Sequence, residues 1–346
     1  MDLPDMVDWD LAISVGSRIA GQGPQVSAAE AAEAVAELRA GADRSTALVA
    51  EYSGLHAPAG TAPVLVVDRA GWVTANVEGF GSVIGPVMER MEERRGAPSG
   101  LTKAIGSRVT ALEIGGLLGF LGSKVLGQFD PFHDPHGRLL LVAPNIVHVE
   151  RELGVDPSDF RLWVCLHEET HRVQFTAVPW MRDHLRSEID ALAGSVDVDP
   201  AELLSTLSSR VGELVRGSSD VSLLDLFAGP EQREVIARVT AVMSLLEGHA
   251  DVVMDEAGPE VIGSLPDIRR KFNQRRRGMS VLDRLLRRLL GLEQKMAQYR
   301  NGAAFVNGVV DKVGFDGLNA VWASPEQLPT VAEIADPAAW VRRVHG

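Results

Sequence analysis

Cysteine is almost absent from this 346-residue chain, in which Cys165 stands alone. A single thiol excludes an intrachain disulfide and leaves thiolate zinc ribbons and iron–sulfur clusters without ligands. Positive charge is also scarce, with 34 Lys and Arg against 47 Asp and Glu and a formal net charge of -13. We therefore expect no nucleic-acid partner and no binding to anionic membrane surfaces, because both require a cationic face.

Long apolar runs are lacking as well. The most apolar stretch, Val109 to Ser123, carries Glu113 and is shorter than the ~20 residues that span a bilayer. We expect it to be a buried helix whose glycines permit close contact with another helix. The N-terminus has acidic residues where a secretory signal needs basic ones, so we expect a cytoplasmic protein, and its oligomeric state stays open.

Hydrophobic periodicity and breaker residues predict a mainly α fold with a small β element. Residues 1–128 form an expected N-terminal helical region, and residues 129–346 a metal-binding region packed with it as one compact unit. Expected helices cover residues 9–19, 27–40, 45–52, 83–95, 101–126, 156–175, 179–193, 200–215, 231–255 and 281–313. Residues 129–137 and the tail after Asn319 are expected to be irregular. Arg138 to Ala143 is the clearest strand, either in the core or at a cleft edge where an extended substrate could pair.

The chemistry is concentrated in His167-Glu168-Glu169-Thr170-His171, an HExxH pattern. Residues four apart share one helix face, so both imidazoles can bind one ion and Glu168 can reach a water molecule on it. The histidines lie on an apolar stripe, where imidazoles without partners are costly. The pattern therefore predicts a Zn²⁺ site. Two core histidines hydrogen-bonded to carbonyl groups are the alternative.

A catalytic zinc site needs a third protein ligand besides the water. Metzincins take a histidine six residues after the second, with a glycine between, but Ala177 and Gln174 occupy those places. Glu247 interrupts an apolar helical stripe and is our preferred ligand, while Asp251, one turn later, can accept the distal N–H of a liganding histidine. Two alternatives stay open: Glu247 pairs with an arginine, or His249 supplies the ligand.

The wider sequence resembles a bacterial family of zinc-dependent metalloproteases or hydrolases of the zincin-like, gluzincin-type superfamily, some of them associated with deazaflavin coenzyme biosynthesis. The resemblance covers nearly the whole chain and rests on the segments VDWD, GQFD, HEETHRVQF, EGHADVVMD, RRKFNQRRRG, NAVWASPEQLPT and DPAAWV. It implies a zincin-like metalloprotease fold with HExxH on a central helix, a zinc site and hydrolase chemistry. It does not define the substrate.

The leading interpretation is a zinc hydrolase acting on a peptide or amide. His167, His171 and Glu247 hold the metal, Glu168 is the general base, and Tyr299 or Arg300 is a candidate oxyanion donor, with ordinary packing as their alternative. The competing interpretation is a catalytically weak or inactive protein that serves as a zinc-stabilised binding module for a protein partner. The arginine-rich segment 269–288 is either a solvated face that balances surplus acids or a cleft border that favours acidic substrates. Cys165 is expected to be a small buried hydrophobe.

Overall fold

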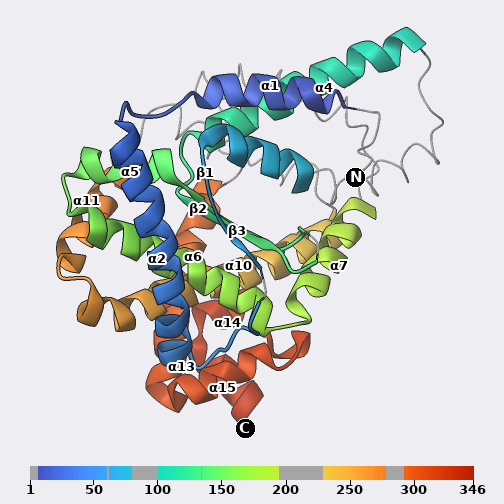
Figure 1. Ribbon diagram of the computed structural model, residues 1–346. Helices are drawn as coiled ribbons and strands as arrows, with labels where there is room; N and C mark the ends of the chain where they lie inside the picture. Colours follow the sequence, from blue (N-terminus) through green and yellow to red (C-terminus); the bar gives the residue numbers. More distant parts are fainter. Residues whose placement is uncertain (1–6, 61, 80–99, 134, 195–228, 278–291) are drawn as a thin grey trace. The chain divides into compact units, whose positions relative to one another are not determined.

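The computed structural model describes residues 7–60, 62–79, 100–133, 135–194, 229–277 and 292–346. Helices dominate these residues, and the strands form one small three-stranded sheet (Figure 1). The expected fold class is therefore confirmed. The helices expected over 83–95 and 200–215 lie outside the described residues.

The chain divides into two compact units. The first comprises residues 1–182 and 253–268, and the second comprises residues 183–252 and 269–346. Helix α10 (Pro230–Val261) contributes residues to both units. The expected organisation into regions 1–128 and 129–346 stays a prediction.

The helices of the first unit begin at the signals that the sequence carries. They are α1 (Trp9–Ala20), α2 (Ala28–Ser53), a helix over residues 69–79, α4 (Gly100–Gly122), α5 (Ala143–Leu153) and α6 (Pro157–Ala177). Before α2, the Ser27 hydroxyl accepts from the Glu30 amide at 3.2 Å, and the Glu30 carboxylate accepts from the Ser27 amide at 2.8 Å. Before α6, the Asp156 carboxylate accepts from the amide of Asp159, and Pro157 occupies the first helical position. Local chemistry therefore sets where both helices start.

One continuous helix, α2, replaces the two helices expected over 27–40 and 45–52. Gly41 lies inside it, and a Cβ added there would approach the Cys165 Sγ atom of α6 to 3.1 Å. The glycine therefore admits α6 close to α2 and does not break the helix. The helix expected over 101–126 ends earlier, at Gly122, before a turn.

The sheet has the order β1-β3-β2, formed by β1 (Val64–Val67), β2 (Gly127–Asp130) and β3 (Arg138–Val142). Strand β1 pairs with β3 in parallel and β2 pairs with it in antiparallel fashion. All five residues of β3 are buried, and β3 pairs with a strand on each side, so its core interpretation is correct and the cleft-edge alternative is wrong. Strand β2 is an outer strand instead, and it includes Phe129 and Asp130, which were expected in a loop.

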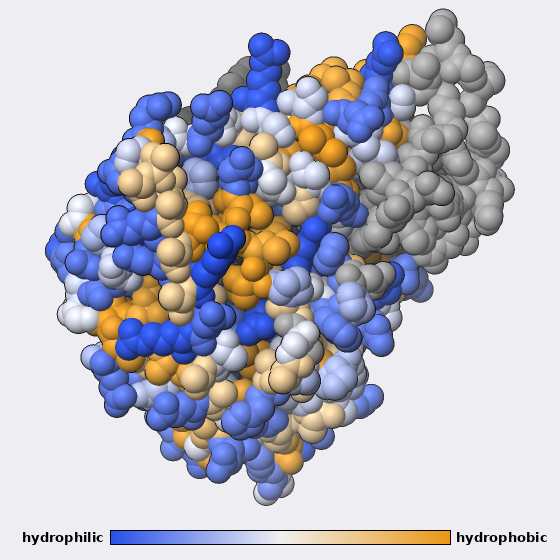
Figure 2. Space-filling view, in the orientation of Figure 1, coloured by the Kyte–Doolittle hydropathy of each residue, from blue (hydrophilic) through white to orange (hydrophobic). Residues whose placement is uncertain are grey.

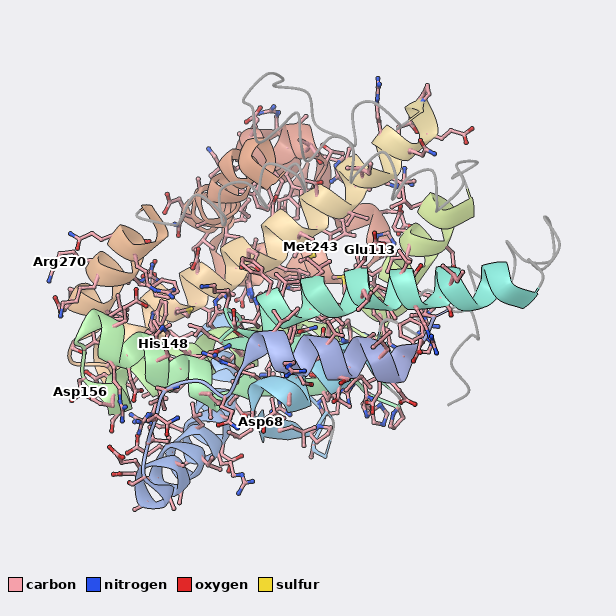
Figure 3. The ribbon with its side chains drawn as sticks, turned by 90° about the horizontal axis from the view of Figure 1, so that it is seen from above. Asp68, Glu113, His148, Asp156, Met243 and Arg270 are labelled. Carbon is pink, nitrogen blue, oxygen red and sulfur yellow. The ribbon has the colours of Figure 1, made fainter. Side chains whose placement is uncertain are left out.

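Helices α1 and α4 lie side by side in the first unit (Figures 1 and 3). A Cβ on Gly115 or Gly119 of α4 would lie 2.6 Å from a backbone oxygen of α1, so the expected glycine-permitted contact is present. Glu113 is exposed on α4, and no helix in the described residues is long and apolar enough to cross a membrane. Several apolar side chains of α1 and α4 are exposed, so the expected burial of the stretch 109–123 is only partial; they are Ile19, Ile105, Val109, Leu112 and Leu117. Figure 2 shows hydrophobic surface in the part of the molecule where these helices lie.

The second unit is also helical. It contains most of α7 (Met181–Gly194), of α10 and of α11 (Leu265–Arg277), together with α13 (Leu292–Leu318), η1 (Asn319–Trp322), η2 (Pro325–Gln327), α14 (Val331–Ala335) and α15 (Pro337–His345). Helices α10 and α13 come into close backbone contact at Gly248 and Gly302. A Cβ on Gly302 would overlap the Ser244 carbonyl oxygen, and one on Gly248 would overlap the backbone of Gly302.

The tail after Asn319 is helical, which corrects the expectation of irregular structure. Thr330 and Glu333 form a capping box at the start of α14, and Asp336 caps α15 ahead of Pro337. These helices have only five and nine residues, and the prolines around them, at positions 325, 329 and 337, obscured the pattern.

Candidate metal centre

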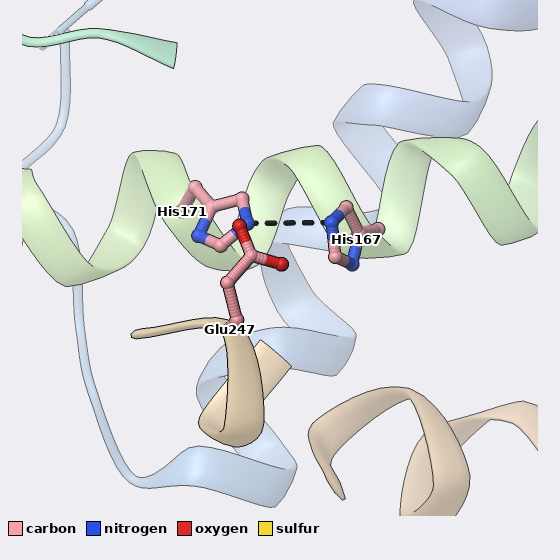
Figure 4. A group of neighbouring side chains, drawn as sticks. All are labelled: His167, His171 and Glu247. Atoms are coloured by element: carbon pink, nitrogen blue, oxygen red, sulfur yellow. Dashed lines mark hydrogen bonds between the residues drawn. The ribbon is translucent and has the colours of Figure 1, made fainter. Parts of the chain in front are cut away.

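Helix α6 brings the two histidines of the HExxH pattern together. His167 and His171 are half-buried, and their Nε2 atoms lie 3.3 Å apart (Figure 4). Zinc–nitrogen bonds of about 2.0–2.1 Å at tetrahedral angles place two ligand nitrogens about 3.3–3.4 Å apart. The spacing of the two imidazoles therefore matches two corners of a tetrahedral zinc site.

Glu247 of α10 completes the group. Its carboxylate faces both imidazoles in Figure 4, and the three residues offer ligand atoms that all lie within 4.8 Å of one another. Two imidazoles and one carboxylate form a donor set that zinc uses in catalytic sites, so these residues fit the ion. All three residues are half-buried.

The alternative ligand His249 lies elsewhere. It is fully buried, and its ring packs edge-on against Trp322 with the ring centroids 5.2 Å apart. Among the described residues, the group able to hold a metal contains Glu247 and not His249.

Each imidazole also has a neighbour at its other nitrogen. The Nδ1 atom of His171 lies 3.0 Å from the Gln174 side-chain oxygen, and the Nδ1 atom of His167 lies 3.2 Å from the sulfur of Met254. Sequence reasoning missed both residues, although Gln174 is one helical turn after His171 and Met254 lies seven residues after Glu247. Asp251 is half-buried, and its backbone carbonyl accepts from Arg269 at 3.2 Å; its expected contact with a liganding histidine stays a prediction.

Glu168 is buried beside the first residue of β2. A Cβ added to Gly127 would lie 2.5 Å from the Glu168 Cγ atom and 2.9 Å from its Oε1 atom. Only glycine at this position therefore leaves room for the glutamate side chain. The sequence contains the GQFD segment, but nothing local in it indicates this contact.

Glu169, the second glutamate of the pattern, has a different environment. Its fully buried carboxylate accepts from the Thr46 hydroxyl of α2 at 2.8 Å and from Arg172 Nε at 2.8 Å. Arg172 also donates to the carbonyl of Ala62 at 3.1 Å. These hydrogen bonds connect α6 to α2 and to the segment before β1. Glu169 therefore has a structural role.

Cys165 is also part of the packing. It is fully buried, and its thiol lies 3.4 Å from the carbonyl oxygen of Leu38. Burial raises the pKa of the Cys165 thiol, and the charges of Glu168 and Glu169 raise it further. The residue therefore remains a neutral thiol, as expected for a small buried hydrophobe.

Two other candidates lie partly outside the described residues. Tyr299 and Arg300 belong to α13, but their side chains are not described, so the oxyanion-donor role stays a prediction. The arginine-rich segment is described as far as residue 277, in α11, and Figure 3 labels Arg270 on that helix.

The chain is similar to known proteins over almost its whole length. A family model described as zincin-like metallopeptidase matches residues 7–341. A crystal structure from Chloroflexus aurantiacus, described as a candidate hydrolase with a novel fold, is 32% identical with a TM-score of 0.73, and the match covers 98% of this chain and 99% of that one. No curated protein matches the chain.

Proposed function

The chain belongs to the zincin-like metallopeptidase family, and from this premise we propose that it is a zinc-dependent peptidase or amidase. The observation that carries the proposal is the convergence of His167, His171 and Glu247, with Glu168 next to the first histidine in the same helix. A purely structural zinc site has no use for an acidic residue at that position.

The proposed roles follow from the residue types. His167, His171 and Glu247 would hold the ion, and zinc in such a donor set would lower the pKa of a water molecule toward ~7 and polarise a carbonyl group. Glu168 accepts the proton of the attacking water and delivers it to the leaving nitrogen. The position of the Glu168 carboxylate against the Gly127 backbone supports this role, because it restricts where the proton carrier can move.

Strand β2 is the proposed docking edge for an extended substrate. The Val142 amide donates to the Leu126 carbonyl at 2.8 Å, so this directly opposed pair is hydrogen-bonded. Along an antiparallel ladder, hydrogen-bonded residue pairs alternate with pairs that are not hydrogen-bonded. The N–H and C=O groups of Gly127 and Phe129 therefore point away from β3. A peptide backbone paired there would pass beside Glu168, and this supports a peptide as the substrate class.

The test compares metal content and turnover in the same variants. We expect His171→Ala and Glu247→Ala to lose zinc, whereas Glu168→Gln keeps near-stoichiometric zinc and loses turnover on a broad peptide library. Equal turnover in wild type and Glu168→Gln would reject the general-base role. Bound zinc without turnover in the wild type would favour the zinc-stabilised binding module instead.

A further inference from the structure

We propose that Gln174 and Met254, two uncharged side chains, are positioning partners that orient the two metal-binding imidazoles. The inference rests on the metal site of the proposed function. A histidine binds a metal through one bare ring nitrogen, while its other nitrogen carries a hydrogen that needs an acceptor. The identity of that acceptor fixes the tautomer and the direction of the ring.

The ring orientations separate the two nitrogens of each histidine. The Nε2 atoms of His167 and His171 face each other at 3.3 Å, beside the carboxylate of Glu247. The Nδ1 atoms contact Met254 and Gln174. Both Nδ1 atoms are therefore the hydrogen-bearing nitrogens when a metal is bound.

Gln174 is well suited to hold His171. It is fully buried, lies one turn further along the same helix, and its amide oxygen is 3.0 Å from Nδ1. Because the ligand and its acceptor share α6, the ring is oriented by the helix itself. The HExxH pattern thereby extends to HExxHxxQ in this chain.

Met254 holds His167 from the other helix. It is 1% exposed, and its sulfur is 3.2 Å from Nδ1. Seven residues return an α-helix to within about 20° of the same direction, so Met254 lies on the same face of α10 as Glu247. A thioether is a weak acceptor, and we expect a smaller contribution from it than from the amide.

The lack of charge on Gln174 and Met254 has a chemical consequence. Carboxylate partners increase the basicity of liganding histidines and so tighten metal binding. An amide and a thioether transfer less negative charge to the imidazoles. Compared with two carboxylates at the same positions, these two partners would leave a bound ion more positive charge for polarising a substrate carbonyl and would hold it less tightly.

Zinc affinity of the full-length chain tests the proposal without any substrate. Apo protein is titrated with Zn²⁺ against a chromophoric chelator at one neutral pH. We expect Gln174→Met to weaken zinc binding about 10–100-fold and Met254→Leu about 3–10-fold. Gln174→Glu, which keeps an acceptor and adds charge, should bind zinc at least as tightly as wild type. Met181→Leu, at another fully buried methionine, is the matched control.

Thermal unfolding of each apo variant separates positioning from damage to the fold. If Gln174→Met does not fold, Gln174→Asn replaces it, since its amide is one methylene too short to reach Nδ1. Unchanged zinc affinity in Gln174→Met and Met254→Leu would overturn the proposal. So would a tenfold loss in Asp251→Asn together with none in Met254→Leu, because the aspartate would then be the partner of His167.

The outcomes also separate this proposal from the proposed function. Wild-type protein that binds zinc tightly but hydrolyses nothing would reject the enzyme, while the affinity series would still decide the outer partners. Active enzyme with unaltered zinc affinity in both variants would reject only the outer partners. Wild-type protein that binds no zinc would reject both.

Discussion

Gly127→Ala tests how tightly the general base is held. The new methyl group would lie 2.5 Å from Cγ, 2.6 Å from Cδ and 2.9 Å from Oε1 of Glu168. Carbon atoms in contact prefer about 3.5–4.0 Å, so about 1 Å of movement is needed. Because β2 is held by its pairing with β3, we expect the glutamate side chain to move rather than the strand.

A displacement of about 1 Å at a reacting group costs on the order of 10²-fold in rate, which is about 2.7 kcal/mol of activation free energy. We expect Gly127→Ala to lose that factor in kcat on a peptide found in the library screen. Zinc stoichiometry should not change, because the substitution touches no ligand. The assay measures kcat, KM and bound zinc on the same preparation.

Two further variants make the test specific. Gly116→Ala, where no heavy atom lies within 4 Å of the new methyl, is the control and should retain wild-type turnover. Glu168→Asp removes one methylene, so the double variant Gly127→Ala/Glu168→Asp should lose less than the two single effects combined. Wild-type kcat in Gly127→Ala, with Glu168 unmoved in its crystal structure, would refute the reasoning.

Three other predictions concern stability. Burial raises the pKa of the Glu333 carboxyl, but the hydrogen bonds from Arg343 and Thr330 and the charge of Arg343 together outweigh this effect, so the pKa lies below the ordinary 4.5. Above pH 4.5 the wild type should therefore have a free energy of unfolding about 1 kcal/mol higher than that of Glu333→Gln, a modest value because Arg343 is partly exposed. This difference should disappear as the pH falls below 4.5 and Glu333 becomes protonated. A difference that does not change with pH would contradict the assignment. Glu169→Gln should lower the free energy of unfolding, measured in urea, by about 3 kcal/mol, because it removes the negative charge that pairs with Arg172. The variant should still bind zinc with full stoichiometry. Loss of zinc would show that Glu169 is not merely structural. Gly302→Ala should cost about 3 kcal/mol by overpacking the crossing of α10 and α13, and a stability equal to that of the Gly116→Ala control would argue against that close contact.

Much of the fold follows from interactions between residues close in sequence. Ser27 with Glu30, and Asp156 with Pro157, predict helix starts, and the structure has them there. The buried strand at Arg138–Val142 was predicted from its apolar run between turn signals. Strands β1 and β2 were missed because each has four residues, and such short segments become strands only when a partner such as β3 pairs with them.

The sequence by itself determined that two imidazoles share one face of α6, because that geometry depends only on the helical repeat. Tertiary structure decided which acidic residue faces them, which uncharged groups contact their outer nitrogens, and that Gly127 makes room for Glu168. Those contacts join segments tens of residues apart, except for the contact between Gln174 and His171, which are three residues apart. No local pattern encodes the other contacts, because the residues that meet are distant in the sequence.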